Sequence, residues 1–180
     1  MTTALLIIDV QSALCAGAWA AFDIDNVIAR INAVSARARA AGVPVIIVQH
    51  EDASGPFQFG TAAWKLPESL LTHEKDARIR KSTPDSFHQT GLQPLLDKLG
   101  ITRLIVCGLQ SDFCVDTTVR RALALGYPVV LVADAHSTVD NGVLSAQQIT
   151  AHHNATLANI TSFGPRVTVL PASEVRVESA

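Results

Sequence analysis

The sequence lacks the features that mark several large classes of protein. Its 14 lysines and arginines face 16 acidic residues with no basic cluster, which argues against binding to nucleic acid or to an anionic membrane. No apolar run approaches the roughly 20 residues that a membrane span requires. The first apolar run, Ala4 to Ile8, is too short for the core of a signal peptide, and no basic segment precedes it. We therefore expect a cytoplasmic protein without membrane or nucleic-acid partners.

Cysteine is scarce as well, with three residues and no CxxC pair. An odd, unpaired set of cysteines argues against a disulfide framework or a structural zinc site and suits a reducing compartment. A glycine-rich phosphate loop is also missing, since Gly108 stands alone after its apolar run. This argues against a flavodoxin-like cofactor binder, and we expect no cofactor.

The segments that are present alternate between strand and helix patterns. Continuous apolar runs predict buried strands, and apolar residues at helical spacing predict helices. We expect Asp25 to cap the first long helix and Gly42 to follow its end. Together with a hydrophobic content of 48%, the alternation predicts one α/β domain over residues 1–180, with a largely parallel sheet covered on both faces. The expected strands are 4–9, 43–49, a short edge strand 79–81, 104–107, 128–133 and 167–170, and the expected helices are 25–41, 91–99, 112–125 and 143–159.

Cys114 is the most informative single residue, because it falls in the first turn of helix 112–125, directly after a buried strand. Helix N-termini carry unpaired N–H groups and a partial positive charge, which lower the pKa of a thiol there. We therefore expect a reactive thiolate at the carboxyl edge of the sheet, where active sites of such folds gather. The alternative is a small buried hydrophobe, the interpretation that suits Cys107 and Cys15.

Asp9 and Lys81 are the candidate partners of this sulfur. Asp9 closes the first strand, where partial burial of the carboxylate would suit it to act as a base. Lys81 follows the short edge strand and would stabilise a thiolate if it points toward Cys114. Read alone, Asp9 is equally a loop or helix cap and Lys81 an ordinary surface charge.

These residues lie within motifs that resemble the isochorismatase-like cysteine hydrolases over nearly the whole chain. The motifs are ALLIIDVQ at the N-terminus, RKSTPDSF around Lys81, VCGLQSDFCVDTTVRRALALGY around Cys114, and the later VADAHST and ITAHHNATL segments. The resemblance implies the three-layer α/β/α, Rossmann-like hydrolase fold of that family, with a six-stranded, mostly parallel sheet. It also implies a catalytic triad of Asp9, Lys81 and Cys114.

The resemblance implies further details of the site. The peptide between Leu109 and Gln110 should be cis, and the N–H groups of Gln110 and Cys114 should form an oxyanion hole. Asp9 would take the thiol proton, and the sulfur of Cys114 would attack the carbonyl of a small carboxamide or ureide. The product would be a thioester, which water then hydrolyses.

The chain departs from the metal-binding nicotinamidases of the same family. Those enzymes hold a metal with an Asp-x-His pattern after the second strand, whereas here His50 precedes Asp52, and the next histidine is His73. We therefore expect no metal and interpret His50 as a hydrogen-bonded residue at a strand end.

The substrate contacts are predicted less directly. Phe57, Phe59 and Trp64 lie in the long polar loop that follows the second strand, where aromatic side chains are expected to cover something. They form either a lid over the substrate or a subunit interface of a homo-oligomer, dimeric or tetrameric. Gln11 and Phe87 are possible secondary contacts.

The sequence thus predicts a metal-free cysteine hydrolase that cleaves the C–N bond of a small amide or ureide. Two alternatives stay open. One is a related reaction, either isochorismatase-type vinyl-ether hydrolysis or nicotinamide deamidation. The other is a non-catalytic family member that serves as a binding or assembly module, which an intact triad would argue against.

Overall fold

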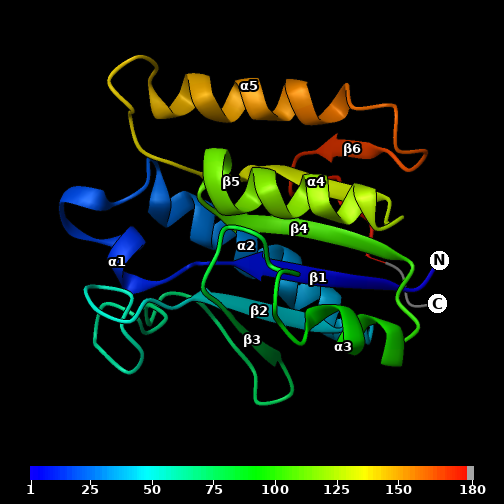
Figure 1. The fold of residues 1–180 in the computed structure, drawn as a ribbon, viewed down its shortest axis with the longest axis horizontal. Helices are drawn as coiled ribbons and strands as arrows, with labels where there is room; N and C mark the ends of the chain where they lie inside the picture. The colour runs from blue at the N-terminus through cyan, green and yellow to red at the C-terminus, as the bar shows by residue number, and fades with distance from the viewer. Residues whose placement is uncertain (178–180) are drawn as a thin grey trace.

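Strand β1 (Thr3–Ile8) lies inside a six-stranded parallel sheet in the computed structural model, which describes residues 1–177 (Figure 1). The strand order is β3-β2-β1-β4-β5-β6, and every neighbouring pair is parallel. The prediction of a mostly parallel six-stranded sheet is therefore confirmed. The other strands are β2 (Val45–His50), β3 (Ala77–Lys81), β4 (Arg103–Leu109), β5 (Val129–Ser137) and β6 (Val167–Leu170).

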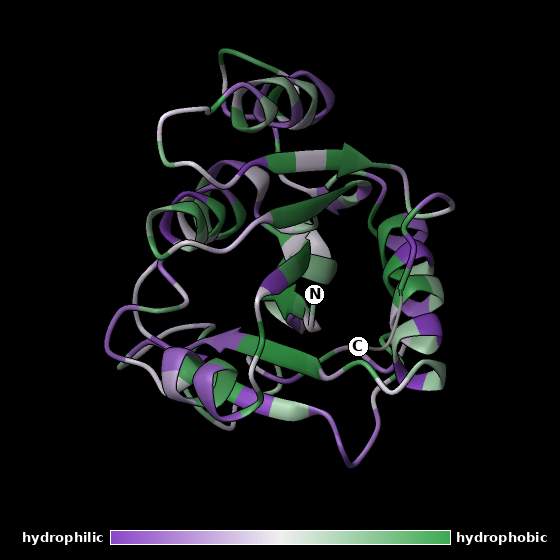
Figure 2. Ribbon diagram, turned by 90° about the vertical axis from the view of Figure 1, so that its right-hand side faces the viewer, coloured by the Kyte–Doolittle hydropathy of each residue, from purple (hydrophilic) through white to green (hydrophobic). Residues whose placement is uncertain are grey.

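Helices cover both faces of this sheet, because alternate side chains of each buried strand point to opposite faces. Leu6 of β1 belongs to the apolar cluster that packs against α3 (Leu92–Lys98), α4 (Asp116–Ala124) and α5 (Ala146–Ala158). Its neighbour Leu5 belongs to the opposite cluster, built on α2 (Ile24–Ala40). Figure 2 shows hydrophobic strands between helices of mixed character. The three-layer α/β/α prediction is confirmed.

Several element boundaries differ from those predicted, for local reasons. Helix α2 begins after Asp23, whose backbone is left-handed (φ 54°) and whose carboxylate accepts a hydrogen bond from Asn26, so the expected cap at Asp25 is wrong. Helix α5 begins at Ala146 instead of residue 143, because Ser145 caps it in a capping box with Gln148.

Two differences concern the carboxyl edge of the sheet. Strand β5 runs four residues beyond the predicted end at 133, because its last residues pair with the end of β4, Gly108 with His136 and Leu109 with Ser137. Two short helical segments that the sequence pattern does not reveal, α1 (Ser12–Cys15) and η1 (Gly17–Trp19), follow β1.

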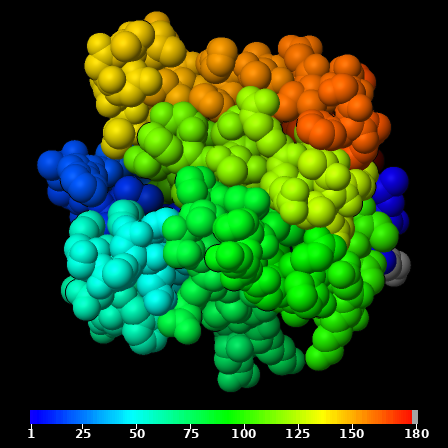
Figure 3. All heavy atoms as spheres, in the orientation of Figure 1, coloured from blue at the N-terminus to red at the C-terminus, as the bar shows by residue number. Residues whose placement is uncertain are grey.

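The long segment between β2 and β3 gathers at this same edge. In Figure 3 it forms, in cyan and blue-green, a lobe beside the blue α1 segment, where the carboxyl ends of the strands meet. No helix within residues 1–177 has the length and apolar character needed to cross a membrane.

Candidate active site

Asp9 is positioned by a sharp turn of the chain at the end of β1. Its backbone is left-handed (φ 50°), a conformation that Asp adopts more readily than most residues. Its N–H donates to the Val48 carbonyl of β2, and its own carbonyl accepts from the Gln11 N–H at 2.8 Å. The carboxylate is consequently held at the carboxyl edge of the sheet, and Asp9 is only 1% exposed.

Gly108 brings the Cys114 turn close to Asp9. Gly108 pairs with Ile8 with a φ of 116°, and a Cβ atom there would collide with the Ile8 backbone, so no other residue fits without a shift. The next peptide, between Leu109 and Gln110, is cis, as the family resemblance implies. The close approach of β4 to β1 places the residues that follow Gly108 beside Asp9.

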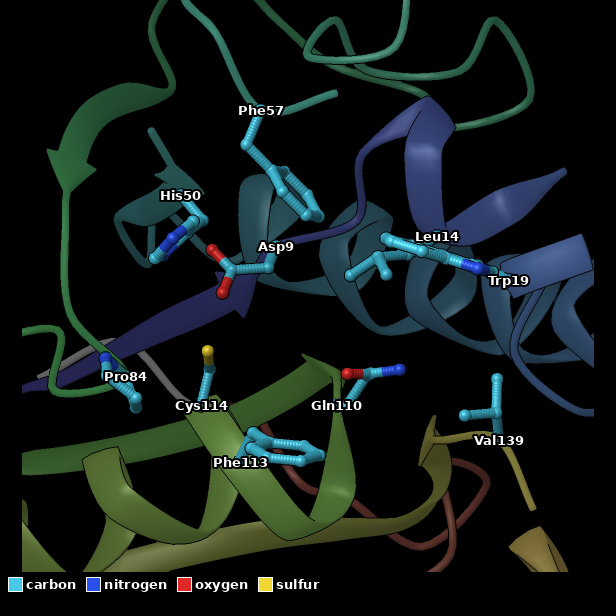
Figure 4. Close-up of a pocket in the computed structure, with 10 residues that line it drawn as sticks. All are labelled: Asp9, Leu14, Trp19, His50, Phe57, Pro84, Gln110, Phe113, Cys114 and Val139. Carbon is cyan, nitrogen blue, oxygen red and sulfur yellow. The ribbon is translucent and has the colours of Figure 1, made fainter. Parts of the chain in front are cut away.

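Cys114 lies in a π-helical turn (Ser111–Val115) that leads into α4, instead of the ordinary first helical turn expected from the sequence. The N–H groups of Phe113 and Val115 both donate to the Gln110 carbonyl, at 3.2 and 3.1 Å. Such π-turns are frequent at functional sites. The turn directs the Cys114 sulfur toward the Asp9 carboxylate (Figure 4).

The Lys81 ammonium lies at the centre of the cluster. Its Nζ is 2.6 Å from Asp9 Oδ2 and donates to Cys114 Sγ at 3.2 Å, and its side chain is 0% exposed. Burial by itself would lower the pKa of Lys81, but the adjacent Asp9 and Cys114 outweigh it, so the pKa is raised. Lys81 therefore stays charged and forms a buried ion pair with Asp9.

The Cys114 thiol is protonated in this arrangement, which corrects the expectation of a resting thiolate. Burial, followed by the negative charge of Asp9, raises the pKa of Cys114 to about 12, although Lys81 acts in the opposite direction. The helix N-terminus does not overcome the loss of hydration. Attack by the sulfur therefore requires a base that removes its proton.

Asp9 has the free acceptor that such a base needs. Within residues 1–177, neither Asp9 oxygen accepts a hydrogen bond of normal geometry, even though Oδ2 is in close ionic contact with Lys81. A buried carboxylate oxygen without a donor is unusual, because desolvation is costly unless hydrogen bonds replace the lost water. Oδ1 is thus available to accept a proton inside the cavity.

His50 completes the cluster from the end of β2. Its Nδ1 lies 3.3 Å from Lys81 Nζ, and its Nε2 lies 3.0 Å from Asp52 Oδ1. Because an ammonium can only donate, Nδ1 accepts from Lys81 and Nε2 carries the proton that Asp52 receives. His50 is therefore a hydrogen-bonded residue at a strand end, as interpreted from the sequence.

The donor atoms of Asp9, His50 and Cys114 lie within 4.8 Å of one another, a spacing that a metal ion could use. The Lys81 ammonium contacts all three side chains, at 2.6, 3.3 and 3.2 Å. A cation therefore already sits among these donors, and a metal would have to displace it. The residues do not fit a metal ion while Lys81 keeps this position.

A cavity of about 400 Å³ opens beside the sulfur. Phe57 is the one predicted aromatic contact of the long loop that lines it, and Gln110 lies opposite (Figure 4). Several other lining residues are not evident from the sequence pattern, but Phe113 carries a usable signal, since it directly precedes Cys114. The residues that line the cavity are Asp9, Leu14, Trp19, His50, Phe57, Pro84, Gln110, Phe113, Cys114 and Val139.

Four predicted substrate contacts, Gln11, Phe59, Trp64 and Phe87, do not line the cavity and make other contacts. The Gln11 side chain is fully buried and bridges the His50 backbone and the Trp64 carbonyl, so it joins the long loop to β1 and β2. Phe59 packs edge-on against Trp64 and beneath the Arg80 guanidinium, away from the cavity wall. Phe87 is likewise not a lining residue, because it stacks on Tyr127 within the apolar core.

A second polar network lies behind the Cys114 turn. Ser111 Oγ is 2.8 Å from His136 Nδ1, and His136 Nε2 is 2.9 Å from Asn154 Oδ1. The Asn154 amide donates to the Ala133 carbonyl, so its oxygen faces His136, and Nε2 must carry the imidazole proton. Burial lowers the pKa of His136 to about 4, which keeps the ring neutral. This network ties the start of the turn to β5 and α5.

Comparison with known proteins identifies the family of the chain. The family model of the isochorismatase domain matches residues 3–169. The chain belongs to the isochorismatase family. A crystal structure of an isochorismatase from Pseudomonas putida KT2440 superposes with a TM-score of 0.89 at 33% identity, covering 97% of this chain and 90% of that one. A crystal structure of another isochorismatase family protein superposes with a TM-score of 0.86 at 37% identity, covering 94% and 98%.

A curated relative of this isochorismatase-family chain is a streptothricin hydrolase of Streptomyces noursei, 42% identical over 138 residues. The match covers 76% of this chain and 50% of that protein. The chain thus spans about half the length of the streptothricin hydrolases that it matches, 50% and 55%.

Proposed function

We propose that the protein is a cysteine hydrolase that cleaves the C–N bond of a small carboxamide or ureide through a thioester on Cys114. The observation that carries this proposal is the buried Asp9 carboxylate beside the fully buried Lys81 ammonium, which also contacts the Cys114 sulfur. A base, a nucleophile and a fixed positive charge in contact are the parts that acyl transfer requires. The match to a streptothricin hydrolase supports the same reaction class.

The reaction begins with the neutral thiol and the Asp9–Lys81 ion pair. As the sulfur attacks the substrate carbonyl, its proton passes to Asp9, and the Lys81 ammonium stabilises the charge that develops on sulfur. The backbone N–H groups of Gln110 and Cys114 hold the oxyanion of the tetrahedral intermediate. Protonated Asp9 then donates to the leaving amine as the C–N bond breaks, and the thioester remains.

Hydrolysis of the thioester reuses the same groups. Asp9, again a carboxylate, accepts a proton from a water molecule that attacks the thioester carbonyl. The same N–H groups hold the second oxyanion, and the sulfur leaves and regains the proton from Asp9. The products are a carboxylic acid and an amine or ammonia, and the site returns to its starting protonation state.

Mass spectrometry of the protein and of its proteolytic peptides tests this proposal. After rapid acid quenching during turnover of a panel of small amides, we expect an acyl adduct on the Cys114 peptide and none on Cys15 or Cys107. Asp9→Asn protein should form no adduct, because nothing removes the thiol proton. Turnover of an amide without any adduct, or turnover by the Cys114→Ala variant, would contradict the thioester route.

We also propose a homo-oligomer, dimeric or tetrameric, in the cytoplasm. Apolar side chains exposed around the long loop support assembly, with Phe59 57% and Leu71 61% exposed. The three cysteines are free thiols, which suits a reducing compartment. Light scattering coupled to size exclusion tests the assembly, since a monomer at micromolar concentration would contradict it.

A further inference from the structure

The walls of the cavity beside Cys114 are almost wholly apolar. Six lining side chains come from separate segments of the chain and carry no charge: Leu14, Trp19, Phe57, Pro84, Phe113 and Val139. Trp19 and Phe113 remain 59% and 53% exposed. Large aromatic side chains held open to solvent around a cavity are typical of a ligand site, because a bound apolar group would cover them.

Two positive charges of β3, those of Lys81 and Arg80, are already committed to other groups. No lysine or arginine is among the lining residues that the structure describes. The Lys81 ammonium is fully buried against Asp9, and Arg80 pairs with Glu51 at 3.1 Å. A substrate carboxylate would therefore lose its hydration without gaining a counter-ion, which is strongly unfavourable in an apolar site.

The shape of the cavity indicates where the body of the substrate lies. Figure 4 shows Phe57 and Phe113 on opposite sides of the space beside Asp9 and Cys114, with Trp19 and Val139 farther along, beyond Gln110. A carbonyl placed at the Cys114 sulfur would direct its substituent between the two phenylalanines. The cavity volume of about 400 Å³ accommodates roughly a dozen non-hydrogen atoms, at about 30 Å³ for each water-sized group.

We propose that this site takes carboxamides whose body is uncharged and apolar, aromatic or branched, and that it rejects those bearing a carboxylate. This inference rests on the proposed function, because it names the substrates of the same site. Trp19 and Phe113 are the specificity-determining residues, since they present exposed apolar area to a ligand without taking part in proton transfer.

A matched series of benzamides tests the proposal. The series consists of 4-methylbenzamide, 4-carboxybenzamide and 4-(aminomethyl)benzamide, which share a ring and an amide and differ in the charge at one position. We expect kcat/KM for 4-methylbenzamide to exceed that for 4-carboxybenzamide by at least about 100-fold, because the carboxylate is desolvated without a partner. Equal or greater kcat/KM for either charged amide would overturn the proposal.

Variants of the lining residues sharpen this test. Trp19→Ala and Phe113→Ala should raise KM for 4-methylbenzamide by about 10-fold with little change in kcat, as expected when uniform binding is lost. Phe163→Ala is the control, because Phe163 is also an exposed phenylalanine (50%) but lies near β6. An unchanged KM in both lining variants would contradict the assignment.

A charge introduced at the far end of the cavity should change the preference. Val139→Arg supplies the missing counter-ion, and we expect it to reduce the 100-fold discrimination against 4-carboxybenzamide to about 10-fold or less. Val143→Arg is the matched control, because Val143 is 87% exposed and outside the cavity. The same shift in both variants would show that overall charge, and not the site, is responsible.

Binding measurements separate failure of this inference from failure of the proposed function. Calorimetry with the Cys114→Ala variant measures affinity for the same three benzamides without chemistry. Preferential binding of 4-methylbenzamide, even if no amide is hydrolysed, supports the inference while contradicting the proposed reaction. Preferential binding of a charged amide overturns the inference even if hydrolysis occurs.

Discussion

Two polar clusters stand on either side of the Cys114 turn, and they are built in opposite ways. In front of the turn, Asp9 and Lys81 form a buried ion pair beside the cavity, and Asp9 has an oxygen without a hydrogen-bond donor. Behind it, Ser111, His136 and Asn154 form a neutral chain whose side-chain atoms are paired. In the first cluster an Asp9 oxygen is free to accept a proton. In the second cluster the side-chain atoms of Ser111, His136 and Asn154 are already hydrogen-bonded to one another or to the backbone. Under the proposed reaction, the first cluster transfers protons, whereas the second holds the fold.

The largest effect we expect comes from removing the sulfur of the front cluster. Cys114→Ala should lower kcat/KM by at least about 1000-fold, because the nucleophile is lost, while the melting temperature changes little. Cys107→Ala is the matched control, since that cysteine is fully buried in β4 within the apolar cluster built on α2, where its thiol donates to the Leu6 carbonyl at 3.5 Å. We expect Cys107→Ala to retain activity and to lose stability. Activity in the Cys114→Ala variant would show that the cluster of Asp9, Lys81 and Cys114 does not supply the nucleophile.

The ion pair of the front cluster should behave as a coupled unit. Lys81→Met leaves the Asp9 carboxylate buried without a counter-charge, and should lower the free energy of unfolding by roughly 3–5 kcal/mol. Adding Asp9→Asn should recover part of that loss, because it removes the unpaired charge. Urea unfolding of the two single variants and the double variant measures this coupling. Simple additivity of the two losses would mean that the pair is not coupled in the folded protein.

The network of Ser111, His136 and Asn154 should make the free energy of unfolding depend on pH. The pKa of His136 is lowered to about 4 in the folded protein, against 6.5 when unfolded, so the unfolded chain binds more protons between these values. Its contribution to stability is complete above pH 6.5 and is lost as pH falls toward 4, by about 3 kcal/mol in all.

Urea unfolding of wild type and His136→Gln across pH 4 to 7 isolates this effect from that of the carboxylates. The difference in unfolding free energy between the two proteins should shrink as the pH falls. A constant difference would show that His136 is not held neutral. In that case the contrast between a charged cluster in front of the Cys114 turn and a neutral one behind it would not hold.

The smallest effect on activity and stability is expected for Asp52, which contacts the front cluster through His50. Asp52 accepts from His50 at 3.0 Å, but its side chain is 48% exposed. Exposed pairs of this kind contribute little, so Asp52→Asn should cost less than about 1 kcal/mol of stability and a few-fold in kcat. A loss beyond about 100-fold in kcat, with stability unchanged, would extend the proton-transfer machinery to Asp52.

The sequence by itself determined the layered fold and the three candidate catalytic side chains. Continuous apolar runs identified the buried strands. Asp9 and Cys114 follow β1 and β4, and Lys81 ends β3, so all three fall at one edge because the strands are parallel. The strand assignments succeed because hydrophobic periodicity is a local property of the chain. The triad itself was implied by the resemblance of the surrounding motifs to a known family. Phe57 was predicted as an aromatic residue in a polar loop, but the same argument also selected Phe59 and Trp64, which do not line the cavity.

The tertiary structure alone decided the protonation of the site and the composition of its wall. Burial beside Asp9 keeps the Cys114 thiol protonated, against the expectation from its place at a helix start, because desolvation depends on neighbours distant in sequence. The same packing placed Trp19 and Val139 in the cavity and moved Gln11 and Phe87 away from it. The local hydrophobic pattern assigns residues to strands and helices. The pKa of a buried group depends instead on side chains that only the folded chain brings together.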